Sequence, residues 1–407
     1  MKKSVLSKIV FSVMIFTLVM SAKIQAEEWN KKDVKILTKG AFTYEAYTSK
    51  KGKQCWIYKV KIDKKKNTAT LKFPKKINGF KVTKIGSKVY KNSDFCYNVF
   101  GNFVEWYHGG DGYTKNMKGI KKVVVPNSVH TITRYSFAGL KNLTKVTLPD
   151  NLKTIDLMVF HKCKKLTKIT IPKSTKKVSV YAFEKCKNLE KFKVNKKNKT
   201  FSAEGGMLLS KKKDKLYYVA PKLTKVIIPD TVTAIGEQAF NYSHAKEVVI
   251  PKSVSKIENN ALTTTAIKTI DLSESNETYA KDGKCIYNKK TKELAVVVNQ
   301  ETSLIVSNKV EIIPNTVSLA GKKVKYMELP SGLKKLELFW HNLTTDMQAE
   351  VKFNAVTPPE LVSDRPGYVY SRYPLYSTII VPKQGEKAYK DWVTKNDGED
   401  FVEIKTY

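Results

Sequence analysis

The chain of 407 residues carries a formal net charge of +37, and only three of its 74 basic residues are arginine. Proteins that read a nucleic-acid sequence rely on the forked guanidinium of arginine, so this composition argues against that class, although charge alone would permit loose DNA binding. Five cysteines without a CxxC motif or metal-ligand spacing argue against a disulfide framework and against a metal site.

Residues 1–26 have the pattern of a secretory signal peptide. Three lysines accompany an apolar stretch from Ile9 to Met20, and cleavage is expected after Ala26, with Ala22 as the alternative. The apolar stretch is short for the ~20 residues that span a bilayer, so export is favoured over a membrane anchor. Without a cysteine at the cleavage site or a second apolar segment near the C-terminus, the mature chain is expected to be released or held at the surface non-covalently.

Residues 27–66 are expected to form an N-terminal cap of alternating strands. Large apolar residues recur there at strand spacing: Phe42, Tyr44, Trp56, Tyr58, Val60 and Ile62. A cap is needed because the open end of the repeat array that follows would expose its apolar interior and its strand edges.

Residues 67–345 carry a repeat with a period of 23 positions in its clearest part. Three residue types mark this spacing: Pro126, Pro149 and Pro172; Phe137, Phe160 and Phe183; and Leu143, Leu166 and Leu189. A fixed period of this size is typical of a stacked repeat protein, in which no repeat can bury its apolar face alone. Within each repeat, Leu-x-x-Val-x-Leu alternates at period 2 and predicts a short strand that the following proline ends. We therefore expect a β-rich solenoid with a parallel sheet of one short strand per coil.

Residues 93–116 are an insertion rich in aromatic residues and glycine. Loops beside a rigid scaffold commonly carry binding, and exposed aromatic rings stack on sugars or anchor protein interfaces. The candidate binding residues in this insertion are Phe100, Phe103, Trp106, Tyr107 and Tyr113. The alternative is that the loop packs on the solenoid as a small core of its own.

Residues 195–228 and 273–306 match each other in register, 78 positions apart. In each, a lysine-rich turn separates two apolar stretches, which predicts a β-hairpin inserted into the coil. Residues 346–407 are expected to form the C-terminal cap, with a strand over 378–381 that Pro382 ends and a short helix over 386–393.

The third and fifth positions of the predicted strand point outward, and lysine recurs at them. These lysines are Lys122, Lys145, Lys168, Lys191 and Lys225 at the third position and Lys193 at the fifth. Stacked strands lie about 4.8 Å apart, inside the Debye length of about 8 Å, so neighbouring lysines repel by about 1 kcal/mol or less. Such a column favours an anionic polymer lying along it. The alternatives are a solvated face whose lysine stems cover the sheet, and a lysine excess that reflects an AT-rich genome.

Cys163 and Cys186 occupy the same repeat position. They are expected to be small buried residues in a ladder, although a disulfide between neighbouring coils is geometrically conceivable.

Glu247 and Asp271 take outward positions in later repeats, which confines the lysine column to the earlier part of the array.

The pattern Ile-Pro-x-x-Val-x-x-Ile-Gly-x-x-Ala-Phe at residues 228–240 resembles the BspA-like leucine-rich repeat family. Residues 73–86 are similar to the usual first repeat of that family, and residues 378–392 to its C-terminal cap. The departures are Asn195 and Ser307 at proline positions, and His341 at a phenylalanine position. The resemblance implies a leucine-rich-repeat solenoid in a secreted or surface-exposed bacterial protein, several of whose relatives are adhesins. It supplies no catalytic residues.

We expect a monomeric bacterial protein, Gram-positive, that is secreted or held at the cell surface and binds a partner without cofactor or metal. An enzyme is disfavoured because the five histidines are scattered and no nucleophile elbow or phosphate loop is present. The favoured partners are anionic glycans, mucins, matrix or cell-wall polymers, engaged by the basic sheet face and the aromatic loop. The alternative is a scaffold that binds one specific protein through the inserted hairpins and the aromatic loop, with charge serving solubility. Loss of binding at high salt would favour the hypothesis of an anionic partner.

Overall fold

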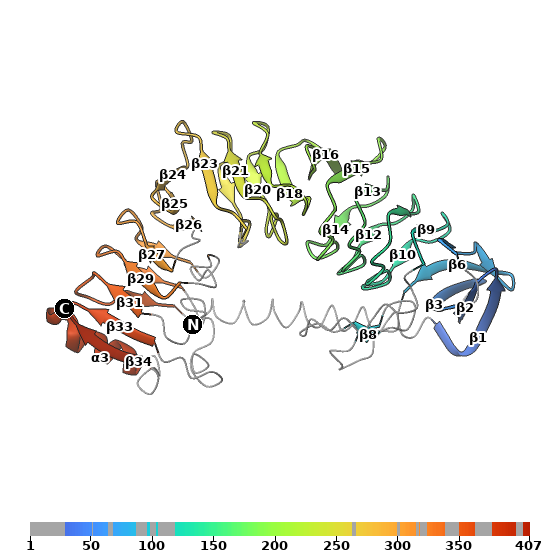
Figure 1. Cartoon of the computed structure of the whole chain (residues 1–407), viewed down its shortest axis with the longest axis horizontal. Coiled ribbons are helices and arrows are strands. Elements are labelled where there is room, and N and C mark those ends of the chain that lie inside the picture. The colour runs from blue at the N-terminus through green and yellow to red at the C-terminus, as the bar shows by residue number, and fades with distance from the viewer. Residues whose placement is uncertain are drawn as a thin grey trace. The chain divides into compact units, whose positions relative to one another are not determined.

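The computed structural model describes residues 29–50, 52–63, 68–86, 96–97, 103–104, 119–262, 266–298, 302–314, 317, 324–337, 350–362, 377–395 and 402–407. The predicted signal peptide and most of the aromatic insertion lie outside the described residues. The chain divides into two compact units, one ending at Phe201 and the other running from Ser202 to Tyr407, and each is described by itself (Figure 1).

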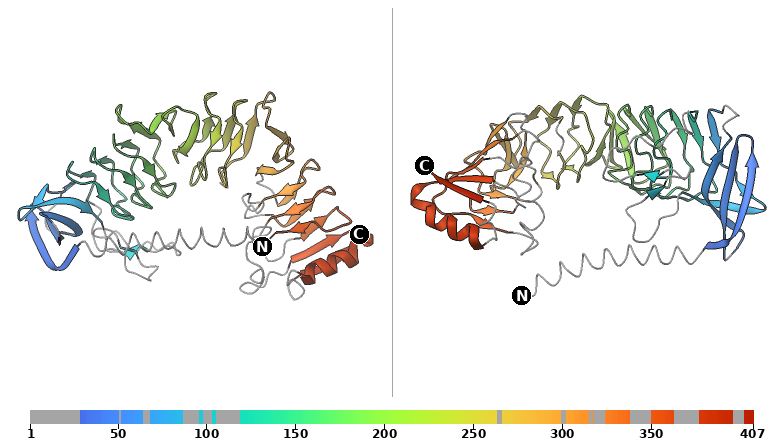
Figure 2. Two further views of the ribbon diagram at one scale, coloured as in Figure 1. Left: turned by 180° about the vertical axis from the view of Figure 1, so that it is seen from behind. Right: turned by 60° about the horizontal axis from the view of Figure 1, so that its bottom comes forward.

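The first unit begins with a meander of three long antiparallel strands: β1 (Trp29–Lys39), β2 (Phe42–Ser49) and β3 (Gln54–Ile62). β3 then pairs in parallel with β6 (Phe80–Ile85), which also pairs antiparallel with β5 (Lys76–Ile77). The meander shows as the blue strands of Figure 2. The hydroxyl of Tyr44 donates to the backbone carbonyl of Lys72 at 2.7 Å, which fastens the meander to the first repeat strand.

Each turn that follows contributes a front strand, formed by the Leu-x-x-Val-x-Leu segment, and a back strand, formed by the Val-x-x-Ile segment. The front strands are β4 (Thr70–Lys72), β9 (Lys122–Val124), β11 (Lys145–Thr147), β13 (Lys168–Ile171) and β15 (Lys191–Val194). The back strands after β6 are β10 (Thr131–Ile132), β12 (Thr154–Ile155) and β14 (Lys177–Val178). All the pairs between turns are parallel, which confirms the predicted stack. The two-residue back strands were not predicted, because two residues are too few to show an alternating pattern.

Ladders of equivalent side chains fill the interior of the first unit. Phe137, Phe160 and Phe183 are fully buried, with ring centroids 5.8 Å and 5.7 Å apart. Burying a phenylalanine side chain is worth about 1.5–3 kcal/mol. The ladder exists only because the 23-residue period returns the same residue to the same place in each turn, so the period itself produces the core.

The second unit repeats this plan and adds two three-stranded meanders, of which the first shares a sheet with back strands and the second forms a sheet of its own. The first meander comprises β16 (Phe201–Glu204), β17 (Met207–Ser210) and β18 (Lys215–Val219), and the second β24 (Tyr279–Asp282), β25 (Cys285–Asn288) and β26 (Leu294–Val297). β18 continues in parallel into the back strands β20 (Ala234–Ile235) and β22 (Lys256–Ile257). Each segment in which the sequence predicts a hairpin therefore holds a three-stranded meander and, after it, one further strand.

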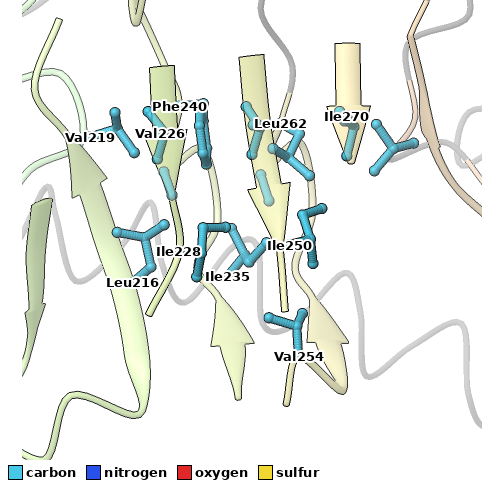
Figure 3. Close-up of a cluster of buried hydrophobic side chains, with 14 of the residues drawn as sticks. Leu216, Val219, Val226, Ile228, Ile235, Phe240, Ile250, Val254, Leu262 and Ile270 are labelled. Carbon is cyan, nitrogen blue, oxygen red and sulfur yellow. The ribbon is translucent and has the colours of Figure 1, made fainter. Parts of the chain in front are cut away.

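The front strands of the second unit form two parallel sheets. One holds β19 (Lys225–Ile227), β21 (Glu247–Ile250) and β23 (Thr269–Leu272); the other holds β27 (Ser303–Ile305), β29 (Tyr326–Leu329), β31 (Glu350–Phe353), β33 (Ser377–Val381) and β34 (Val402–Thr406). The later back strands are β28 (Ile312–Ile313), β30 (Lys335–Leu336) and β32 (Glu360–Leu361). Figure 3 shows side chains of successive turns, among them Ile228, Ile235 and Ile250, gathered between the strands in a buried cluster.

The second unit ends with a 3₁₀ turn (Lys383–Gly385), the helix α3 (Glu386–Lys395) and the strand β34. The predicted helix is confirmed, whereas β34 was not predicted. Tyr389 and Trp392 lie buried on the inner face of the helix and donate to the backbone carbonyls of Ala355 and Pro359, at 3.1 Å and 2.8 Å. Among the described residues, no helix has the length and apolarity needed to cross a membrane.

Candidate functional site

The front strands of the first unit present two rows of side chains on their outward surface, which we call the lysine face. One row is Thr70, Lys122, Lys145, Lys168 and Lys191, and the other is Lys72, Val124, Thr147, Thr170 and Lys193. The residues between the two rows, such as Val123, Ile169 and Phe192, point inward and are buried. Strand alternation therefore aims every lysine of the two rows away from the core.

The lysines of neighbouring turns are direct register partners. Lys122 lies opposite Lys145 across β9 and β11, and Lys168 lies opposite Lys191 across β13 and β15. β11 and β13 are in contact but are not joined by ladder hydrogen bonds, so the row consists of two adjacent pairs. Paired strands lie about 4.8 Å apart, a distance at which two ammonium groups repel each other.

The lysine face carries six lysines and no acidic residue. Within the described part of the chain, none of these six ammonium groups lies within 4.0 Å of a carboxylate; they are Lys72, Lys122, Lys145, Lys168, Lys191 and Lys193. Among the described residues, therefore, no carboxylate neutralises their positive charge.

The outward lysines of the second unit have a different environment. Lys225 lies opposite Glu247 in the register of β19 and β21, and their charged groups are 3.3 Å apart. Lys352 and Lys405 lie 3.4 Å from the carboxylates of Glu328 and Glu403. The repeat position of Lys225 predicts that it belongs with the first-unit lysines, but in the structure it lies in the second unit and has a carboxylate partner.

The aromatic candidates fall mostly outside the described residues. This holds for Phe100, Trp106, Tyr107 and Tyr113. For Phe103 the structure describes the backbone only, in the strand β8 (Phe103–Val104), where it pairs with Tyr97 of β7 (Cys96–Tyr97). Their role in binding stays a prediction.

The cysteines that the structure describes with their side chains are free and buried. The thiols of Cys163 and Cys186 lie 3.3 Å and 3.0 Å from the backbone carbonyl oxygens of Phe137 and Phe160, each in the preceding turn. The disulfide left open by the sequence is therefore not present. Burial, together with the neighbouring Cys186, raises the pKa of the Cys163 thiol well above its usual range, so it is a poor nucleophile.

Among the described side chains, no group of three or more histidine, cysteine, aspartate or glutamate residues is placed to hold a metal ion. His161 and Glu184 form a buried pair one turn apart, with Nδ1 and Oε2 separated by 3.5 Å. This pair lies in the wall of the coil, where both side chains are about 6% exposed, so a substrate has no access to it.

Residues 111–204 and 211–337 match the family described as BspA type leucine rich repeat region, in six copies. These stretches make up more than half of the chain. The chain belongs to the BspA-type leucine-rich repeat family. The prediction of this family from the repeat pattern is confirmed, and so is the fold class, a β-rich leucine-rich-repeat solenoid with stacked parallel strands.

Several solved structures match the chain at low sequence identity. The pneumococcal vaccine antigen PcpA is 14% identical, with 91% of this chain and 98% of that chain covered and a TM-score of 0.36. A leucine rich cell surface protein from Faecalibacterium prausnitzii is 15% identical over 74% and 90% of the two chains, with a TM-score of 0.33. A leucine-rich repeat protein from Eubacterium ventriosum is 16% identical over 78% and 83%, with a TM-score of 0.37. No curated protein sequence matches the chain.

Proposed function

We propose that this BspA-type protein is exported to the bacterial surface or secreted, and that it binds an anionic polymer through the lysine face. The observation that carries the proposal is the contrast between the two units. Six outward lysines of the first unit have no carboxylate nearby among the described residues, whereas Lys225, Lys352 and Lys405 of the second unit each have one. Host glycans or mucins, matrix and the cell's own wall polymers are the candidate ligands.

The physical argument rests on charge balance. A row of like charges at the spacing of paired strands destabilises the fold slightly when it is empty, and an anionic polymer removes that repulsion along its whole length. Binding of such a polymer also releases the counterions condensed on it, so the affinity depends steeply on salt. Lysine suits this role because it offers mobile point charges without the directional fork of arginine.

The test compares two variants with equal loss of charge. The lysine-face variant changes four lysines of the lysine face to glutamine: Lys122, Lys145, Lys168 and Lys191. The matched variant changes to glutamine four lysines that have carboxylate partners: Lys213, Lys225, Lys352 and Lys405. Binding to a sulfated glycan, a mucin, a wall polymer and a matrix protein is measured by titration across a salt series.

We expect the lysine-face variant to bind about tenfold or more weakly. The logarithm of its association constant should also fall less steeply with the logarithm of the salt concentration, by up to about four in slope. The matched variant should keep the affinity within about threefold, because it changes the same net charge elsewhere. Equal losses in both variants would reduce the effect to net charge and overturn the proposal. Salt-insensitive binding retained by both would favour a specific protein partner of the hairpins and the aromatic insertion.

A further inference from the structure

We infer that the ligand of the lysine face is an acidic polysaccharide that lies across the front strands, with its anionic groups on the lysine row and its hydroxyl groups on the neighbouring threonines. The inference rests on the proposed function and narrows its ligand. It is based on the side chains that lie beside the lysines in the two central turns of the lysine face.

Threonine accompanies lysine in register on the two central strands. Thr147 follows Lys145 by two residues on β11, and Thr170 follows Lys168 by two on β13, so each pair lies on the same side about 6.6 Å apart along the strand. Both threonines are exposed, and their hydroxyl groups make no hydrogen bond to any described residue. Each of these turns therefore offers one cation and one hydroxyl, the pair of groups that an acidic sugar ring complements with its anion and its own hydroxyls.

The register sets the direction of the ligand. A linear polymer that runs across the strands meets Lys122, Lys145, Lys168 and Lys191 in successive turns. A polymer that runs along any one of β9, β11 and β13 meets a single lysine of the lysine face. The crossing direction therefore brings the most charges together, at a repeat of about 4.8 Å between paired strands.

The composition of the lysine face disfavours nucleic acid and a protein partner. Binding of single-stranded nucleic acid uses exposed aromatic rings on which bases stack. Phe192 is the aromatic residue within these front strands, and it is only 4% exposed. Arginine and exposed aromatic side chains, which dominate protein-binding hot spots, do not occur in the two rows. Inorganic polyphosphate can neutralise the ammonium charges of the lysines, but it has no hydroxyl groups beside its own charges that could form hydrogen bonds with Thr147 and Thr170.

The test uses the full chain and three probes of matched charge: size-defined oligogalacturonates, which carry one carboxylate on each sugar; inorganic polyphosphate; and a single-stranded oligonucleotide. The variant Thr147→Val with Thr170→Val keeps the side-chain shape and removes both hydroxyls. Its control is Thr269→Val, at an exposed outward threonine of β23 in the second unit.

We expect the affinity for oligogalacturonate to rise with length until the oligomer spans the row of lysines and then to level off. The double valine variant should bind it about three- to tenfold more weakly, with binding of polyphosphate unchanged and the control like the parent. Polyphosphate or the oligonucleotide binding as tightly as oligogalacturonate, an unaffected valine variant, or affinity independent of length would each overturn the inference while leaving the proposed function standing. Binding of none of the three probes would overturn both.

Discussion

Asn198 and Asn276, 78 positions apart in the sequence, make equivalent hydrogen bonds from the same place in their repeats. In each, the side-chain NH₂ donates to carbonyls of the preceding turn and the side-chain oxygen accepts from backbone N–H groups two and three residues ahead. The acceptors are Pro172 and Thr175 for Asn198, at 2.6 Å and 3.0 Å, and Pro251 and Val254 for Asn276, at 3.1 Å and 2.9 Å, with a longer contact of 3.4 Å from Asn276 to the Lys252 carbonyl. The donors are Thr200 and Phe201, and Thr278 and Tyr279, at 2.7–3.0 Å. Both amides are buried, so each ties two turns together where a meander begins.

Replacement of either asparagine by alanine should lower the free energy of unfolding by about 2–4 kcal/mol, because several buried backbone groups lose their partner at once. Urea unfolding followed by far-ultraviolet circular dichroism measures this. The control is Asn188→Ala, whose amide donates to the Lys164 carbonyl at 2.7 Å in an exposed setting and should cost less than about 1 kcal/mol. A cost for Asn198→Ala no greater than that of the control would contradict the assignment.

The phenylalanine ladder should be the most sensitive part of the first unit to truncation. Phe160 is fully buried and packs between Phe137 and Phe183, so Phe160→Ala should cost about 3–5 kcal/mol. Because stacked turns stabilise mainly their neighbours, hydrogen exchange should accelerate first in the turns that hold these three residues. Ile227→Ala, at a site 60% exposed, should change stability by less than about 0.5 kcal/mol. Uniform exchange across the unit would show that the ladder is not the local anchor.

Four thiols should resist alkylation in the folded protein. Burial raises the pKa of Cys55 to about 12 and also raises those of Cys163 and Cys285, and Cys186 is equally buried. Iodoacetamide near pH 8 should therefore leave all four unmodified until urea unfolds the chain, as peptide mass spectrometry would show. Rapid labelling of Cys163 in the native protein, or recovery of Cys163 and Cys186 as a disulfide-linked peptide, would refute this.

Glu258 should make stability depend on pH in the acid range. Burial raises the pKa of its carboxyl, but hydrogen bonds from Lys215 at 2.6 Å and 2.8 Å and from the Glu237 N–H, with the nearby charge of Lys256, outweigh burial and hold the pKa below its usual value. A lowered pKa gives stability that is present above the ordinary glutamate value of about 4.3 and is lost as the pH falls through the folded pKa. Between about pH 5 and pH 3 the parent should therefore lose more unfolding free energy than Glu258→Gln.

The control for Glu258 is Glu204→Gln, which breaks an ion pair to Lys213 whose two side chains are each 47% exposed. Its unfolding free energy should fall with acid as the parent's does, since exposed pairs contribute little. If Glu258→Gln showed the same acid sensitivity as this control, Glu258 would not be the group responsible.

Much of the fold follows from the period alone. A repeat that returns Pro126, Pro149 and Pro172 to equivalent places requires stacked turns, and the alternation before each proline requires a strand there. The buried asparagines were not predicted, because Asn198 and Asn276 sit in polar, lysine-rich stretches that read as turns. Their register match, 78 positions apart, is the signal that could have found them.

The sequence by itself determined the family, the parallel stack and the lysines that lie opposite one another, because a fixed period decides which residues are neighbours in successive turns. The tertiary structure alone decided where strands beyond the period form, such as the two-residue back strands and β34, since these depend on hydrogen bonds between turns. It also decided which lysines keep an uncompensated charge. Lys122 and Lys145 face each other without a described carboxylate near them, while Lys225 lies 3.3 Å from Glu247. Ion pairing depends on the distance between charged groups in space, and the spacing of residues along the chain does not supply it.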